Sequence, residues 1–225
     1  MNNSIILLSG GLDSLVALGY VQKHTDLNIE LALTFDYGQK AIESEISASK
    51  KICEYFSIKH KIIKLDWLKE ITKTSLVSDS EVPKDGFENK NSAEAVWVPN
   101  RNALFLNIAA CYCESYDIDY IVFGANKEES GKFSDNKPEY VEITNQSFKY
   151  STQKHPEVIA PCCNMNKVDL VNYMIENNIS FELIKSCYQN IKNTNKKHCA
   201  QCMSCKLLYN AIMNSKKPEL IKEIF

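Results

Sequence analysis

The sequence predicts an α/β fold, a Rossmann-like parallel sheet with helices on both faces. Two observations indicate it. An apolar run at 5–8 passes through a glycine turn into a helical pattern at 12–22, and a second apolar run follows at 29–35. Strands this apolar are typical of a parallel sheet that is covered on both sides. Ligands of such sheets bind at the carboxyl ends of the strands, where residues 36–39 fall.

Later segments continue this alternation of strands and helices. Residues 41–56 and 103–115 predict helices, as do residues 166–177, whereas 59–65 and 120–123 predict strands. The polar stretch 73–93 predicts a long loop, either a lid or binding segment or an excursion without fixed structure. Residues 126–131 and 135–139 predict a loop over the ligand edge, for which a solvated run of charges is the alternative.

Size and composition indicate one globular domain. With 225 residues, 44% hydrophobic and 24% charged, the chain is expected to form a nucleotide-binding core over about 1–180 and a metal-bearing segment over about 186–225. The net charge of −2 provides no basic surface for nucleic acid, which is not an expected partner. No segment approaches the ~20 apolar residues of a membrane span.

Cysteine usage indicates a reducing compartment. Nine cysteines, an odd number, argue against a secreted disulfide framework and for a cytoplasmic protein whose thiols are free or bind metal. Cys53, Cys111 and Cys113 fall in apolar helical segments, where small buried side chains are the expected interpretation.

The glycine turn after the first strand predicts a phosphate-binding loop. Gly10 and Gly11 let the backbone turn sharply and bring its N–H groups close to an anion, and the following helix adds its positive end. The loop has no lysine and only one Gly-Gly pair, so it fits neither G-x-x-x-x-G-K-[ST] nor G-x-G-x-x-G. A merely structural turn, with Asp13 as the helix cap, is the alternative.

Arg101 is predicted at a helix start, directly after residues 98–100. A cation is unfavourable at the positive end of a helix, so Arg101 is expected to serve an anion or a carboxylate instead.

The second strong pattern lies near the C-terminus, where Cys187 is followed by Cys199, Cys202 and Cys205 in a C-x-x-C-x-x-C run. Four thiolates at this spacing predict a closed tetrahedral site, for which zinc is the best candidate. His198 is a possible substitute ligand. An iron–sulfur cluster and free structural thiols are the alternatives.

The S-G-G-x-D-S loop resembles that of the PP-loop ATP pyrophosphatase superfamily, and the whole chain resembles the 7-cyano-7-deazaguanine synthase (QueC) family. Matches run from end to end in the family's order. They comprise residues 35–39, Val98-Pro99-x-Arg101-Asn102, Gly124-x-Asn126, Pro138-Glu139, Pro161, Lys167, Ser186-Cys187-Tyr188 and the final cysteine run.

This resemblance implies a cytoplasmic ligase, a zinc-containing homodimer that uses ATP, Mg²⁺ and ammonia. It would convert 7-carboxy-7-deazaguanine to 7-cyano-7-deazaguanine for queuosine synthesis. The carboxylate would become an acyl-adenylate that ammonia turns into an amide, and adenylation of the amide oxygen would then yield the nitrile. Each activation would release AMP and pyrophosphate.

The resemblance also assigns residues, with Asp13 poised to ligate Mg²⁺. Catalytic roles fall on Ser9, Asp13, Ser14 and Arg101. ATP binding falls on Leu8, Ser9, Gly10, Gly11, Leu12, Asp13, Ser14, Phe35, Tyr37 and Gln39, with Phe35 and Tyr37 bordering the adenine. Binding of the acid falls on Arg101, Asn102, Asn126, Glu129, Asp135, Lys137 and Lys167.

The chain departs from the family pattern on the side of the acid. Glu129 stands for an aspartate, Phe133-Ser134 for a tyrosine-proline pair, Lys137 for an arginine and Cys162 for a leucine. A QueC-like paralogue that stops at the amide or joins the acid to another amine, as in phage defence, is therefore the main alternative. A tRNA thiolation enzyme and a non-catalytic module that binds zinc and nucleotide are the others.

Overall fold

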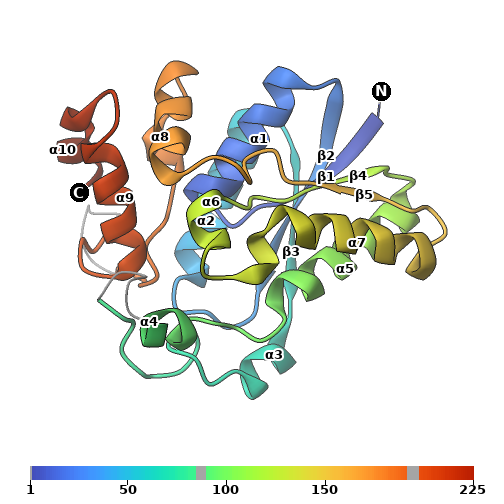
Figure 1. Ribbon diagram of the computed structural model, residues 1–225, viewed down its shortest axis with the longest axis horizontal. Coiled ribbons are helices and arrows are strands. Elements are labelled where there is room, and N and C mark those ends of the chain that lie inside the picture. The colour runs from blue at the N-terminus through green and yellow to red at the C-terminus, as the bar shows by residue number, and fades with distance from the viewer. Residues whose placement is uncertain (1, 85–89, 192–197) are drawn as a thin grey trace.

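The computed structural model describes residues 2–84, 90–191 and 198–225. Its centre is one parallel sheet of five strands in the order β3-β2-β1-β4-β5 (Figure 1). The predicted fold class is confirmed. The strands are β1 (Asn2–Leu7), β2 (Leu27–Asp36), β3 (Lys59–Lys64), β4 (Tyr120–Val122) and β5 (Glu157–Ile159).

Alternating apolar side chains give the sheet a core on each face. Ile5 packs into one buried cluster and Ile6 into the other, because successive side chains of a strand point to opposite faces. A register shift between Ser4 and Ile5 leaves one extra residue in β2, so Ile29 and Leu31 also lie on opposite faces.

Helices cover both faces, as expected of a sheet that is apolar on both sides (Figure 1). One core contains side chains of α1 (Leu12–His24), α2 (Ile42–Phe56), α8 (Lys167–Glu176), α9 (Met203–Met213) and α10 (Ile221–Ile224). The other contains side chains of α3 (Asp66–Ile71), α4 (Lys90–Ala95), α5 (Arg101–Tyr116) and α7 (Pro138–Ser151). Among the described helices, none combines the length and apolarity that a bilayer crossing needs.

Two predicted loops are partly helical. The stretch 73–93 runs into α4, and its residues 85–89 lie outside the described residues. Leu76 and Val82 of that stretch are buried, so its described part packs against the core. The polar region after Gly124 contains α6 (Lys127–Ser130) and the 3-10 turn η1 (Ser134–Asn136), and Pro138 opens α7. Asn126 caps α6, and Pro138 stands at the first position of α7, where proline fits a helix.

One cysteine prediction was wrong. Cys53 and Cys113 are buried, as expected, but Cys111 is exposed. Cys113 falls on the α5 face that contacts the sheet, and Cys111, two residues earlier, falls on the outer face.

The strand order places the ligand edge between β1 and β4. The chain moves outward from β1 to β2 and β3, and then returns to the other side of β1 to form β4 and β5. Such a switch point opens a crevice at the carboxyl ends of its two strands. Gly124, two residues after β4, lets the two sides of this crevice approach closely. A Cβ at Gly124 would lie only 2.8 Å from the backbone nitrogen and Cα of Ser14.

Candidate active site

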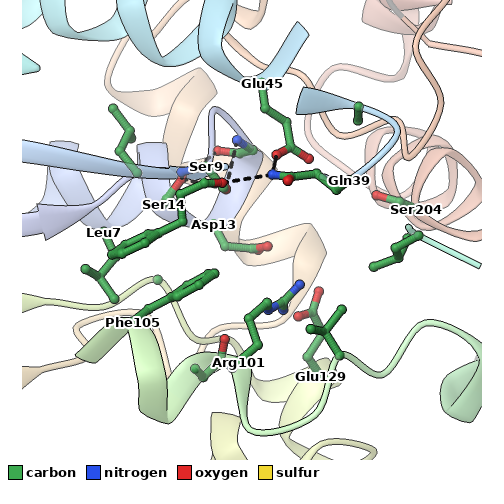
Figure 2. A pocket seen from close by; sticks show the side chains of 18 of the residues that line it. Leu7, Ser9, Asp13, Ser14, Gln39, Glu45, Arg101, Phe105, Glu129 and Ser204 are labelled. Carbon is green, nitrogen blue, oxygen red and sulfur yellow. Dashed lines mark hydrogen bonds between the residues drawn. The ribbon is translucent and has the colours of Figure 1, made fainter. Parts of the chain in front are cut away.

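A pocket of about 240 Å³ lies at this carboxyl edge (Figure 2). The loop after β1, the end of β2 and the first turn of α2 form one part of its wall. The starts of α5, α6 and α8 and the segment at 185–188 form another part, and residues 96–98, residues 133–136 and Ser204 also line the pocket. Chemistry-bearing side chains in the lining are Ser9, Asp13, Ser14, Tyr37, Gln39, Glu45, Arg101, Asn102, Glu129, Asp135, Lys167, Lys185 and Tyr188.

Gly10 shapes the turn at the floor of this pocket. Its φ of +75° lies in the left-handed region, and a Cβ there would stand 2.8 Å from Ala48 Cβ and 2.9 Å from the Glu45 carbonyl oxygen. The turn therefore packs directly on α2. Gly11 then caps α1, whose first-turn N–H groups have no partner within the helix. An anion is the natural partner for such a helix start.

The two loop serines hold one another. Ser14 Oγ accepts a hydrogen bond from Ser9 N at 3.3 Å and lies 3.2 Å from Ser9 Oγ. Ser14 Oγ also donates to the Gly11 carbonyl at 3.3 Å. Both hydroxyls therefore fix the loop and still line the pocket.

Asp13, Lys167 and Glu129 form a buried ionic cluster. Lys167 Nζ lies 2.8 and 2.7 Å from the two Asp13 carboxylate oxygens and 2.9 Å from Glu129 Oε1. Asp13 does more than face its own helix start, because both of its carboxylate oxygens contact Lys167. The three side chains come from α1, α6 and α8.

Asp13 and Glu129 contact the same ammonium group, but their pKa values shift in opposite directions. Burial alone would lower the pKa of Lys167, but Asp13 and Glu129 raise it, so Lys167 stays charged. Burial also opposes ionisation of Glu129, yet Lys167 holds the pKa of Glu129 below its ordinary value. For Asp13, burial and the negative charge of Glu129 outweigh Lys167 and raise its pKa. Two carboxyl groups around one cation titrate as a coupled pair.

Local caps position this ionic cluster. Asn166 and Asp169 form a capping box at the start of α8, with Asn166 Oδ1 accepting from Asp169 N at 2.9 Å and Asp169 Oδ2 accepting from Asn166 N at 2.9 Å. This fixes Lys167 as the first residue of the helix. On the opposite side, Asn126 Oδ1 accepts from Glu129 N at 3.0 Å and starts α6.

An aromatic wall lies across from the glycine turn. The rings of Phe35 and Phe105 are stacked with centroids 4.0 Å apart, and Tyr37 is tilted against Phe105 at 5.8 Å. Arg101 Nη1 donates to the Tyr37 hydroxyl at 3.1 Å. Burial raises the pKa of Tyr37 despite the nearby guanidinium, so the phenol stays neutral and its contact with Arg101 is a hydrogen bond, not an ion pair.

Gln39 joins the β2 edge to α2. Its Nε2 donates to the Phe35 carbonyl at 3.0 Å and to Glu45 Oε2 at 2.7 Å, and its Oε1 accepts from Tyr37 N at 3.0 Å. Gln39 is thus a clamp between the turn at 36–38 and the Glu45 carboxylate. Its predicted contact with ATP stays a prediction.

Most of the predicted site residues meet in this pocket, with three exceptions. Gly10 forms the turn behind the lining, and Asn126 is fully buried behind Glu129. Lys137 is exposed, caps the start of α7 and does not line the pocket. A role for Lys137 in binding the acid stays a prediction.

Several lining residues were not predicted. These are Glu45, Trp97, Phe105, Lys185 and Tyr188. Trp97 stacks on Phe133 with ring centroids 5.6 Å apart at the rim. Glu45 and Phe105 lie inside helical patterns that carry no ligand signature, whereas the quoted Ser186-Cys187-Tyr188 match was a usable signal for the C-terminal wall.

The four predicted cysteines form one cluster. The Sγ atoms of Cys187, Cys199, Cys202 and Cys205 all lie within 4.8 Å of one another. Cys199 and Cys205 are 3.8 Å apart, and Cys187 and Cys202 are 4.0 Å apart. His198 is not part of the cluster: its Nε2 accepts from Ser186 N at 3.2 Å and its Nδ1 lies 3.3 Å from the Ile224 carbonyl. Ser204, between two of the cysteines, lines the pocket.

Comparisons with known proteins agree with this architecture. A family model described as "Queuosine biosynthesis protein QueC" matches residues 3–216. The chain is 44% identical over 223 residues to the 7-cyano-7-deazaguanine synthase of Methanosarcina barkeri, covering 94% of each chain. It is 44% identical over 217 residues to that of Carboxydothermus hydrogenoformans, covering 94% of this chain and 98% of the relative.

A solved structure shares the fold. The U34-tRNA thiolase NcsA from Methanococcus maripaludis, determined with its [4Fe-4S] cluster, aligns with a TM-score of 0.52 and 16% identity. The alignment covers 100% of this chain and 75% of the thiolase. At this identity the likeness concerns the fold alone.

Proposed function

This chain belongs to the QueC family, and we propose that it is a 7-cyano-7-deazaguanine synthase that joins ammonia to 7-carboxy-7-deazaguanine with ATP. The observation that carries the proposal is the near end-to-end identity of 44% with curated synthases, of which the chain covers 94% to 98%. The pocket supplies what such chemistry needs: an anion-binding turn, buried cations and an aromatic wall.

The glycine turn is proposed to bind the pyrophosphate of ATP. Adenylation places growing negative charge on the departing pyrophosphate, so donors must already face the place where that charge appears. The first-turn N–H groups of α1 supply such donors, and the Ser9 and Ser14 hydroxyls would join them by leaving the hydrogen bonds that they make with each other and with the Gly11 carbonyl. Lys167 adds an ammonium group, which it shares with Asp13 and Glu129. Phe35 and Phe105 offer a flat apolar surface for the adenine.

Arg101 is proposed to hold the carboxylate of the acid. Its guanidinium carries no carboxylate ion pair within the described residues, and its one side-chain hydrogen bond goes to the neutral Tyr37 hydroxyl. A planar acid placed there would bring a carboxylate oxygen toward the α-phosphorus of ATP. Asn102, Glu129 and Asp135 line the same wall and are proposed to contact the heterocycle.

The reaction then runs in two activations. A carboxylate oxygen attacks the α-phosphorus and pyrophosphate leaves. Ammonia next attacks the acyl carbon, the bond to AMP breaks, and an amide results. In the second activation the amide oxygen is adenylated, and loss of AMP and the nitrogen protons leaves the nitrile. The protein's main task is to exclude water and align the reactants.

Zinc is proposed for the cysteine cluster. Tetrahedral thiolates at ~2.3 Å from zinc would place the sulfurs roughly 3.8 Å from one another. Two pairs of sulfur atoms, 3.8 and 4.0 Å apart, are close to this separation, and all four lie within 4.8 Å of one another. With four protein ligands no position remains for a substrate, so the ion would stabilise the fold of the C-terminal segment.

Magnesium is proposed to enter with ATP. Asp13 and Glu129 offer the carboxylate oxygens that Mg²⁺ prefers. Both already contact Lys167, so binding at Asp13 competes with an ion pair.

We also propose that the protein forms a homodimer and works in the cytoplasm. Unprotected thiolates favour a reducing compartment. Light scattering on purified protein measures the mass directly; a monomer at all concentrations would exclude the dimer.

The departures from the family pattern favour no second function. Ser134, Lys137 and Cys162 do not line the pocket. Glu129 and Phe133 do, and they keep a carboxylate and an aromatic ring there. Mass spectrometry of the product formed from the acid, ammonia and ATP tests the choice. The nitrile is expected, whereas an amide as the final product would point to the paralogue. A brown, iron-bearing preparation would favour thiolation chemistry.

A further inference from the structure

Amide formation needs a group that removes a proton from ammonium, because ammonia is mostly protonated in neutral water and only its free form has a lone pair. This inference rests on the proposed function. In the described part of the chain, four carboxyl groups line the pocket: Asp13, Glu45, Glu129 and Asp135. Asp13 and Glu129 already share the Lys167 ammonium.

Glu45 and Asp135 make no ion pair in the described residues, unlike Asp13 and Glu129. The partner of Glu45 Oε2 is the neutral amide of Gln39, 2.7 Å away. Asp135 accepts from Asn136 Nδ2 at 3.2 Å, and the largest charge acting on it is Arg101. Glu45 differs from Asp135 in how it is held: the Gln39 amide that contacts Glu45 is itself bound to two backbone groups, whereas Asn136 directly follows Asp135 in the chain.

The surroundings fix the Glu45 side chain. Gln39 is held on both sides by backbone groups of Phe35 and Tyr37, so its amide cannot turn away from Glu45. Glu45 Oε1 accepts no hydrogen bond from any residue that the structure describes. Figure 2 shows the Glu45 carboxylate beside Gln39, across the pocket from Arg101 and Glu129, so that the proposed site of the reacting carboxylate lies between Glu45 and Arg101. The backbone carbonyl of Glu45 packs on Gly10 of the phosphate turn.

Charged and titratable neighbours set its basicity. They are Asp36 and Tyr37 at the end of β2, Arg101 on α5 and Lys185 after the η2 turn (Phe181–Leu183). Burial raises the pKa of Glu45 above its ordinary value, and the Gln39 hydrogen bond and the two cations only partly offset this. A carboxylate of raised pKa is a better match for a proton acceptor working near neutral pH.

We propose that Glu45 is a catalytic base that takes a proton from ammonium beside the acyl-adenylate. The N–H bond breaks, the proton passes to Glu45 Oε1, and the freed lone pair forms the C–N bond at the acyl carbon. The bond from that carbon to the AMP oxygen breaks, and AMP leaves with the electron pair. The nitrogen of the adduct loses its second proton to water, and no oxidant or reductant is needed.

The test separates the two half-reactions. Exchange of labelled pyrophosphate into ATP, dependent on the acid, reports acyl-adenylate formation and needs no ammonia. In Glu45→Gln this exchange is expected to stay within about threefold of the unaltered enzyme, while amide formation at neutral pH falls roughly 10²–10³-fold, the range of general base catalysis. The deficit is expected to shrink as the pH rises toward the pKa of ammonium.

Two further variants sharpen the result. Glu43→Gln, on the same helix but exposed, is the matched control and should leave both half-reactions unchanged. Glu45→Asp keeps the carboxylate, so its rate of amide formation is expected to lie between those of the unaltered enzyme and Glu45→Gln. That rate should fall at low pH, where the aspartate becomes protonated. This variant keeps the assignment testable if the glutamine variant folds poorly.

Three outcomes would overturn the assignment. Equal losses in exchange and in amide formation at every pH would make Glu45 a structural residue. Unchanged amide formation in Glu45→Gln, with a pH-dependent loss in Asp135→Asn, would move the base to Asp135. No acid-dependent exchange in the unaltered enzyme would refute the proposed function itself, a result distinct from the other two.

Discussion

The ionic cluster and the cysteine cluster adjoin the same pocket but are assembled in opposite ways. Asp13, Glu129 and Lys167 come from three helices that are far apart in sequence and face a cavity. Three of the four cysteines lie within seven consecutive residues, and their sulfur atoms face one another. The first cluster holds buried charge beside a cavity, whereas the second has the arrangement that we propose for a metal ion. The comparison teaches that side chains facing a cavity are gathered by the fold from distant elements, whereas metal-ligand spacing can be supplied by a short stretch of sequence.

Loss of a metal ligand should have the largest effect. Structural zinc contributes on the order of 10 kcal/mol, comparable to the whole stability of roughly 5–15 kcal/mol of a domain. In Cys202→Ala we expect the zinc content to fall toward zero and the segment from Cys187 onward to unfold. Elemental analysis and circular dichroism measure this, and the exposed Cys111→Ala is the control. Full zinc content in Cys202→Ala would show that the cysteine cluster is not the zinc site.

Lys167→Met should have the next largest effect. It leaves two buried carboxyl groups facing each other without their cation, a situation that costs about 3–5 kcal/mol. It also removes a positive charge from the proposed pyrophosphate site, so turnover should fall at least about 10²-fold. Denaturant unfolding and acid-dependent AMP release measure the two effects. Lys127→Met, at an exposed position on α6, is the matched control.

A third prediction concerns pH. Lys167 holds the pKa of Glu129 below its ordinary value of 4.5, so this carboxylate stabilises the fold above that value. The stabilisation is lost as the pH falls below 4.5 through the lowered pKa. At neutral pH the free energy of unfolding should therefore be about 2 kcal/mol larger for the unaltered protein than for Glu129→Gln, which is the order of a charged hydrogen bond. Chemical denaturation should show this gap narrowing in acid; a constant gap would contradict the ion pair.

The smallest effect is expected from the helix cap beside Lys167. Asn166→Ala removes the side-chain acceptor of the capping box and should cost about 1 kcal/mol. For a chain of this size that is a fall of roughly 2–4 °C in Tm, which calorimetry resolves. Asn166→Asp keeps an acceptor and should restore the Tm. A larger loss of activity than of stability in Asn166→Ala would show that the cap also positions Lys167 for catalysis.

The same contrast explains what the sequence could predict. The cysteine cluster follows from local spacing, and the phosphate turn follows from one apolar strand, two glycines and a helix. The pairing of Lys167 with Asp13 was not predictable, because nothing local in the sequence says which side chains meet across the sheet edge. Asp13 looked like a cap or a magnesium ligand until its partner was located.

Short elements escaped prediction for a related reason. The three-residue strand β5 carries too little alternation to stand out from a loop, and α6 depends on the cap at Asn126 rather than on apolar periodicity. Glu45 was missed because an acidic residue in the first turn of a helix is also what ordinary helix electrostatics favours.

The central claim is that this pocket adenylates first the acid and then the amide. The most direct test traces the two carboxyl oxygen atoms of the acid into the nucleotide product. The unaltered enzyme is given ATP, ammonia and 7-carboxy-7-deazaguanine labelled with ¹⁸O in its carboxyl group, and the nucleotide products are weighed by mass spectrometry. If the acid and then the amide are adenylated at this pocket, each carboxyl oxygen leaves on an AMP, and two labelled AMP molecules appear per nitrile. Formation of ADP, or of AMP without the label, would contradict the account.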